Sequence, residues 1–187
     1  MSTKTLGVSA GGSDYYVRDL MPAVELSNTS SFNVRVTGRV CYVPFQVRHA
    51  LTADGLIAVH GNVGAGNLYV ALYDSDPTVA PQPRNRLAVS ASTAVSGTTR
   101  RQYVAFTVPI QLQTGIYFGA LESDNNTDNY LGLYSHLAQF IGGPVQGINP
   151  FYEDLGPYAI PPLGATPLAW VDDDRQLRLY LRVSSIP

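Results

Sequence analysis

The chain has 187 residues, 45% of them hydrophobic and only 14% charged, with a formal net charge of −2 at pH 7. This length suits one domain with a sizeable core. The weak negative charge excludes the basic surface typical of proteins that bind nucleic acid, and no apolar run approaches the length of a membrane span. We therefore expect one domain that binds neither nucleic acid nor membrane and exposes many neutral side chains.

Residues 1–30 are rich in Ser, Gly and Thr, and their apolar residues follow no regular period. We expect an extended N-terminal arm, because a polar lead followed by apolar islands suits a segment that orders on binding. The residues expected to contact a protein partner are Tyr15, Tyr16, Val17, Leu20 and Met21. A frayed terminus is the alternative. The stretch has no apolar core of signal-peptide length, so we expect synthesis in a cytoplasm.

From residue 32 onward, apolar and polar residues alternate with the period of two that indicates a β-strand. The alternation over residues 32–42 predicts a strand with Val34, Val36 and Val40 on its buried face, continued after a bend to residue 47. The chain's one cysteine, Cys41, lies within this strand. We expect an inert, buried or half-buried thiol, and no disulfide can form within the chain.

Three glycines, Gly61, Gly64 and Gly66, form a turn between two further predicted strands, residues 56–60 and 68–73. A phosphate-binding turn is followed by a helix, whose N-terminus supplies free N–H groups. Here the alternation after the turn predicts a strand instead, and no lysine follows the glycines. We therefore interpret the stretch as a β-hairpin and expect no bound nucleotide.

The rest of the chain alternates short strands with loops, and no segment has a helical period. Loops are predicted at residues 74–86 and 141–169, the second with six prolines. The other predicted strands are residues 87–90, 103–108 (followed by residues 109–112), 115–122, 130–137 and 177–183. This pattern predicts an all-β fold, an antiparallel β-sandwich of the jelly-roll type over residues 31–187. The side chains expected between its two sheets are Val34, Val36, Val40, Leu68, Val70, Leu72, Val104, Phe106, Leu177, Leu179 and Leu181.

The sequence shows no recognisable catalytic motif, and its three histidines lack metal-ligand spacing. Asp124, Asn126 and Asp128 resemble the start of a calcium loop. However, Asn129 stands where that loop needs glycine, and Ser135 stands where it needs glutamate. We expect a polar turn there, and we predict no catalytic residue, no metal, no cofactor and no enzyme activity.

Tyrosine is abundant, with 12 residues against one tryptophan, Trp170. Tyr69 and Tyr73 fall on the polar face of their predicted strand, and Tyr130 and Tyr134 share one face of theirs. These rings would suit either a sugar-stacking platform or contacts with a neighbouring subunit, and we favour the subunit contacts. With the low charge and the proline-braced loops, they lead us to expect a homotrimer.

Three segments resemble a β-sandwich module of bacteriophage virion proteins, which occurs in capsid-surface and tail-fibre proteins. They are YVPFQV at residues 42–47, GNLYVALYDSD at residues 66–76 and TGIYFGALESD at residues 114–124. The resemblance covers residues 38–125, and its motifs specify strands, turns and tight packing rather than chemistry. It implies a virion structural protein with the β-sandwich fold that the alternation predicts independently.

The interpretation we prefer from this resemblance is a capsid decoration, or cement, protein that stabilises the phage head. Its partner would be the major capsid protein or another virion protein, and it would reside in the virion after synthesis in the host cytoplasm. One alternative is a tail or fibre protein that binds a host surface glycan. Another is a free carbohydrate-binding or carbohydrate-active domain.

Overall fold

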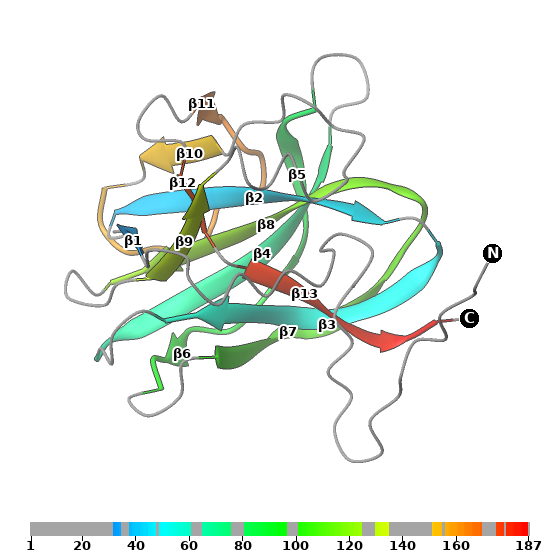
Figure 1. Ribbon diagram of the computed structural model, residues 1–187, viewed down its shortest axis with the longest axis horizontal. Coiled ribbons are helices and arrows are strands. Elements are labelled where there is room, and N and C mark those ends of the chain that lie inside the picture. The colour runs from blue at the N-terminus through cyan, green and yellow to red at the C-terminus, as the bar shows by residue number, and fades with distance from the viewer. Residues whose placement is uncertain are drawn as a thin grey trace.

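The structure is a computed structural model, and it describes residues 32–34, 38–47, 49–60, 65–75, 81–96, 101–124, 130–134, 151–154, 156–169, 175–177 and 179–186. The strands among them are β1 (Phe32–Val34), β2 (Arg39–Val47), β3 (Leu51–Val59), β4 (Asn67–Ser75), β5 (Pro83–Val89), β6 (Thr93–Ala94), β7 (Arg101–Leu112), β8 (Gly115–Ser123), β9 (Tyr130–Tyr134), β10 (Phe151–Asp154), β11 (Leu168–Ala169), β12 (Arg175–Leu177) and β13 (Leu179–Ser185). No helix occurs in these ranges (Figure 1), so the all-β prediction is confirmed.

The strands form three antiparallel sheets. The largest has seven strands, in the order β11-β10-β2-β8-β4-β5, with β6 also paired to β4. The second has the order β13-β3-β7, and the third has the order β1-β9-β12. In the sequence, residue 178 alone separates β12 of the third sheet from β13 of the second.

The main hydrophobic core lies between the seven-stranded sheet and the β13-β3-β7 sheet. Its buried residues are Cys41, Val43, Val47, Leu51, Ala53, Leu56, Ala58, Leu68, Val70, Leu72, Val95, Val104, Phe106, Leu112, Leu121, Leu179, Leu181 and Val183. The prediction of a position between the sheets is thereby confirmed for Leu68, Val70, Leu72, Val104, Phe106, Leu179 and Leu181. Two sheets that bury one shared layer of side chains are consistent with the predicted antiparallel β-sandwich.

The opposite face of the seven-stranded sheet is also buried. A second cluster there consists of Val40, Tyr42, Ala71, Tyr73, Phe118 and Ala120. The prediction that Val40 lies between the two sheets is therefore wrong, because successive residues of β2 point to opposite faces and Cys41 occupies the inner one. The side chains of Val34, Val36 and Leu177, also predicted between the sheets, lie outside the described residues.

The glycine turn after residue 60 joins two sheets rather than two paired strands, so the predicted hairpin is wrong. β3 pairs with β7 and β13, whereas β4 pairs with β8, β5 and β6. Gly66 has a φ of 115°, a conformation that glycine adopts without steric cost. The alternation of a strand is the same whether the strand folds back beside its predecessor or crosses to the other sheet. Local pattern therefore could not distinguish these two connections.

Several other predicted elements are divided or extended. The predicted strand at residues 32–42 is interrupted at Gly38, which has a φ of 72°, and β1 and β2 belong to different sheets. A Cβ atom at this glycine would lie 2.7 Å from the carbonyl oxygen of Gly156. The predicted closing strand is likewise shared between β12 and β13. Strands occur in both predicted loops, because β5 begins within residues 74–86 and both β10 and β11 lie within residues 141–169.

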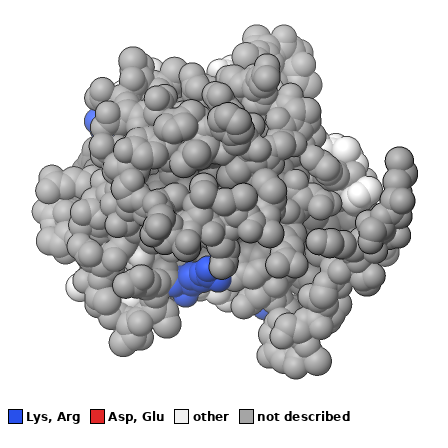
Figure 2. Space-filling model, in the orientation of Figure 1, with Lys and Arg blue, Asp and Glu red and all other residues white. Residues whose placement is uncertain are grey.

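In the view of Figure 2, the described side chains that are visible include basic ones below the centre and at the upper left edge, and uncharged ones at the right. The predicted N-terminal arm, residues 1–30, lies outside the described residues and stays a prediction.

Candidate functional site

The feature that sequence reasoning missed is a cover over the outer face of the seven-stranded sheet. We call residues 156–167, which connect β10 to β11 and contain four of the chain's prolines, the strap. The hydroxyl of Tyr73 on β4 donates to the carbonyl oxygen of Pro162 at 2.5 Å, and Ala165 packs against the second cluster. Tyr42, Tyr73 and Phe118 beneath the strap are fully buried.

The strap also pairs with the main chain of β5, at the edge of the sheet. The amide of Arg86 donates to the carbonyl of Leu163 at 2.8 Å, and the amide of Ala165 donates to the carbonyl of Arg84 at 2.7 Å. The guanidinium of Arg86 donates to the carbonyl of Pro161. These bonds occupy polar groups that an edge strand otherwise leaves open to pairing with other chains.

Glu153 on β10 binds the C-terminal end of the strap. Its Oε2 accepts a hydrogen bond from the hydroxyl of Tyr42 at 2.8 Å and from the amide of Thr166 at 3.1 Å, and its Oε1 accepts from the Thr166 hydroxyl at 2.7 Å. The rings of Tyr42 and Tyr73 meet edge to face, with centroids 5.2 Å apart. Burial, with smaller contributions from Tyr73 and Glu153, raises the pKa of Tyr42 far above its usual value. Both carboxyl oxygens of Glu153 are therefore satisfied, as a buried polar group requires.

Glu122 on β8 binds the N-terminal end of the strap and is less well satisfied. Its Oε1 accepts a hydrogen bond from the amide of Ala159 at 3.0 Å, and the residue is fully buried. Its Oε2 is buried without a hydrogen-bonding partner among the described residues. Burial raises the pKa of this carboxyl to about 7; the Ala159 bond opposes the rise, and the charge of Asp124 adds to it.

Beside Glu122, a tyrosine ring of β4 stacks on a tyrosine ring of the strap. Tyr69, which pairs with Glu122 in the β4–β8 register, stacks on Tyr158 of the strap with ring centroids 5.0 Å apart and an interplanar angle of 23°. The hydroxyl groups of Tyr158 and Ser92 are 2.9 Å apart. Burial is the main cause that raises the pKa of Tyr158 to about 12.

The prediction that Tyr69 and Tyr73 face a neighbouring subunit is wrong for Tyr73, which is fully buried by the strap of its own chain. Tyr69 is half-buried against the same strap. The strap is distant in sequence, so the alternation of β4 gave no sign of it. A usable signal was nonetheless present, because the segments LYVALY and IYFGAL are almost continuously apolar, a pattern typical of strands buried on both faces.

The other sites considered from sequence have separate outcomes. Asp124, the first residue of the calcium-like segment, accepts bonds from the amide of Asn67 at 2.6 Å on Oδ1 and from its side-chain nitrogen at 3.0 Å on Oδ2. Asp124 thus fastens the end of β8 to β4, while Asn126 and Asp128 lie outside the described residues. The expected partner-binding residues, Tyr15, Tyr16, Val17, Leu20 and Met21, lie outside them too, as does Trp170.

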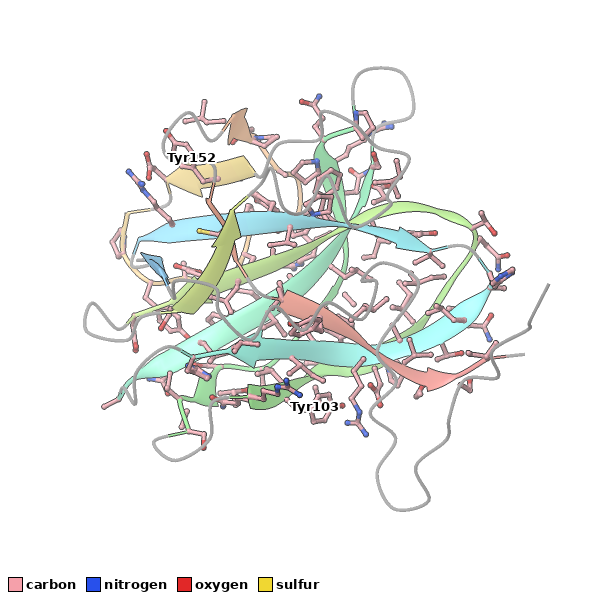
Figure 3. The ribbon with its side chains drawn as sticks, viewed as in Figure 1. Tyr103 and Tyr152 are labelled. Carbon is pink, nitrogen blue, oxygen red and sulfur yellow. The ribbon has the colours of Figure 1, made fainter. Side chains whose placement is uncertain are left out.

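Two tyrosine–arginine contacts lie on the surface (Figure 3). On the outer side of the β13-β3-β7 sheet, the Arg182 guanidinium lies 3.8 Å from the ring centroid of Tyr103, whose hydroxyl donates to the carbonyl of Asp54 at 3.2 Å. At the opposite part of the molecule, Arg39 lies 4.9 Å from the ring centroid of Tyr152. The Arg39–Tyr152 contact joins the neighbouring strands β2 and β10, and the Arg182–Tyr103 contact reaches across β3 to join β13 to β7. We therefore assign both a structural role.

Within the described ranges, no three His, Cys, Asp or Glu side chains gather in a way that could hold a metal ion. Those ranges also contain no helix long and apolar enough to cross a membrane. The thiol of Cys41 is buried, and burial raises its pKa to about 12, as expected of an inert thiol.

Comparisons of the chain with models of protein families, with curated proteins and with solved structures found no match.

Proposed function

We propose that this protein is a non-enzymatic structural component of a bacteriophage virion and that its sandwich is a jelly-roll. The role that we favour is capsid decoration, in which the protein binds the lattice of the major capsid protein and stabilises the head. The observation that carries the proposal is the position of the three segments that resemble phage virion proteins. They form β2, β8 and β4, which are direct neighbours in the seven-stranded sheet. The resemblance therefore belongs to one packed unit rather than to scattered fragments.

The strap supplies a surface suited to a protein partner. Ile160 and Leu163 of the strap and Leu168 of the adjoining β11 are exposed, and Leu163 retains 72% of its accessible surface. Exposed apolar side chains on one segment are typical of interaction sites on soluble proteins. Main-chain bonds to β5 and side-chain bonds to Glu122 and Glu153 hold the strap against the sheet.

Residues 1–30 are proposed as a second anchor, and the assembled form is proposed to be a homotrimer. Apolar residues after a lead rich in Ser and Gly suit a segment that adds hydrogen bonds to a partner's sheet edge. Repetition of such weak contacts over a symmetric oligomer increases avidity.

The experiment that tests the location is quantitative mass spectrometry of purified particles. Several hundred copies per particle support decoration, whereas a few to a few dozen copies indicate the tail or fibre, with glycan binding as its expected role. Absence of the protein from particles would refute a virion role. Light scattering of the purified protein then tests the trimer, and a monomer both in solution and on the particle would contradict it.

The binding surface is tested by incorporation of variants into particles. We expect the Leu163→Ser substitution to reduce occupancy, because it removes an exposed apolar contact without disturbing the core. Val108→Ser is the matched control, since Val108 is 68% exposed on β7, in the other sheet. Deletion of residues 1–28 is expected to leave a folded sandwich and also to reduce occupancy. Normal occupancy of the Leu163 variant would exclude the strap as an anchor, and normal occupancy of the truncated protein would exclude the arm.

A further inference from the structure

The strap is held at its two ends by carboxyl groups that differ in how well they are satisfied. At the C-terminal end, Glu153 receives three hydrogen bonds, from Tyr42 and from both the amide and the hydroxyl of Thr166. At the N-terminal end, Glu122 receives one, from the amide of Ala159, and its second oxygen is buried without a partner among the described residues. A buried carboxyl with an open oxygen tolerates its neutral form far better than its charged form.

The surroundings of Glu122 offer little compensation for a negative charge. Directly after its own strand lies the charged group Asp124, which is also acidic. From β4, Tyr69 pairs with Glu122 in register and Tyr73 lies close enough to feel its charge. From the strap, Tyr158 faces it, and burial, the main cause, raises the pKa of this phenol to about 12, so it remains neutral at physiological pH.

We propose that the strap is a pH-sensitive cover, in which ionisation of Glu122 releases the N-terminal part of the strap, residues 156–160, from the sheet. The C-terminal half, residues 163–167, stays in place, because its attachment depends on Glu153 and on main-chain bonds to β5. Release lets water reach the carboxylate of Glu122 and exposes the stacked pair of Tyr69 and Tyr158.

The pH range over which the strap opens follows from the pKa values of the Glu122 carboxyl in the closed and open states. The pKa of Glu122 is about 7 under the closed strap, whereas an exposed glutamate has a pKa near its ordinary value of 4.5. Opening is therefore coupled to loss of a proton between these two values, and the closed strap is favoured at acidic pH. Between pH 5.5 and pH 8, this difference increases the open fraction on the order of 10-fold.

Hydrogen exchange of the full chain, measured by mass spectrometry and corrected for the intrinsic effect of pH, tests the proposal. We expect the protection of the Ala159 amide, measured on peptides that cover residues 158–160, to fall on the order of 10-fold from pH 5.5 to pH 8, while the amides of Ala165 and Thr166 keep theirs. Glu122→Gln keeps the acceptor for Ala159 and cannot ionise, so its amides 158–160 should show no such fall. Glu153→Gln is the matched control at the other end of the strap and should retain the pH dependence of amides 158–160.

Three results would overturn the proposal. They are constant protection of amides 158–160 in the wild-type protein, an equal fall in both halves of the strap, and the same fall in the Glu122→Gln protein. The wild-type comparison of the two pH values does not depend on whether either variant folds. It is also independent of the virion proposal, because it needs only the purified chain.

Discussion

Replacement of Glu122 by glutamine should remove a pH-dependent loss of global stability. In the unfolded chain this carboxyl titrates near its ordinary pKa of 4.5, and in the folded protein burial raises the pKa to about 7. Between these values, the unfolded state has released the proton while the folded state still holds it. The unfolded state therefore binds fewer protons, and the free energy of unfolding falls as pH rises. Below pH 4.5 this loss is absent, and above pH 7 it is complete.

The size of the loss follows from the two pKa values. They differ by about 2.5, from 4.5 to about 7, and each unit corresponds to about 1.36 kcal/mol, so the loss is at most about 3 kcal/mol. It will be smaller if the strap opens locally, because local opening hydrates the carboxylate without unfolding the sheets.

Urea denaturation at several values between pH 5 and pH 8 measures this effect. We expect the wild-type protein to lose about 1–3 kcal/mol relative to Glu122→Gln across this range, with most of the change between pH 5 and pH 7. Comparison with the variant cancels the contributions of the three histidines and the other carboxyl groups. A difference between the two proteins that does not change with pH would refute the reasoning, since it would mean that Glu122 titrates alike in the folded and unfolded states.

Three further predictions concern the cores and the thiol. Gly55→Ala should lower the free energy of unfolding, measured by urea denaturation, by about 3 kcal/mol, because the new Cβ atom would lie 2.3 Å from a main-chain oxygen of β7. Gly164→Ala is the control, because open space surrounds Gly164. It should change the free energy of unfolding by less than about 0.5 kcal/mol. Leu72 is fully buried in the main core, so Leu72→Ala should lower the free energy of unfolding by about 2–5 kcal/mol. Leu163→Ala on the exposed strap should lower it by less than about 0.5 kcal/mol. Similar losses in the two variants would contradict the burial of Leu72 and the exposure of Leu163. The buried Cys41 should react with a thiol reagent at neutral pH only when urea unfolds the protein, and rapid labelling of the folded chain would contradict its burial.

The sequence by itself determined the class of secondary structure and much of the main core. Period-two alternation located β2, β4, β7 and β8, and it placed Leu68, Val70, Leu72, Val104 and Phe106 between the sheets. These features are local, because a strand that buries one face must repeat its apolar residues every second position. The burial of Cys41 could be predicted for a similar reason, from its place within a strand.

The tertiary structure alone decided how the strands pair and what covers the seven-stranded sheet. The local sequence pattern around the glycine turn predicts a hairpin. In the structure, however, β3 and β4 pair with different strands from other parts of the chain. The contacts of the strap are equally remote in sequence, since Tyr42 binds Glu153 across 111 positions and Ala159 binds Glu122 across 37. The alternation of apolar and polar residues indicates which face of a strand is buried, but it does not indicate which segment of the chain covers that face. Burial of the Glu122 carboxyl, with one oxygen lacking a hydrogen-bonding partner among the described residues, and its raised pKa depend on that covering segment. They follow from the folded chain and from no local pattern.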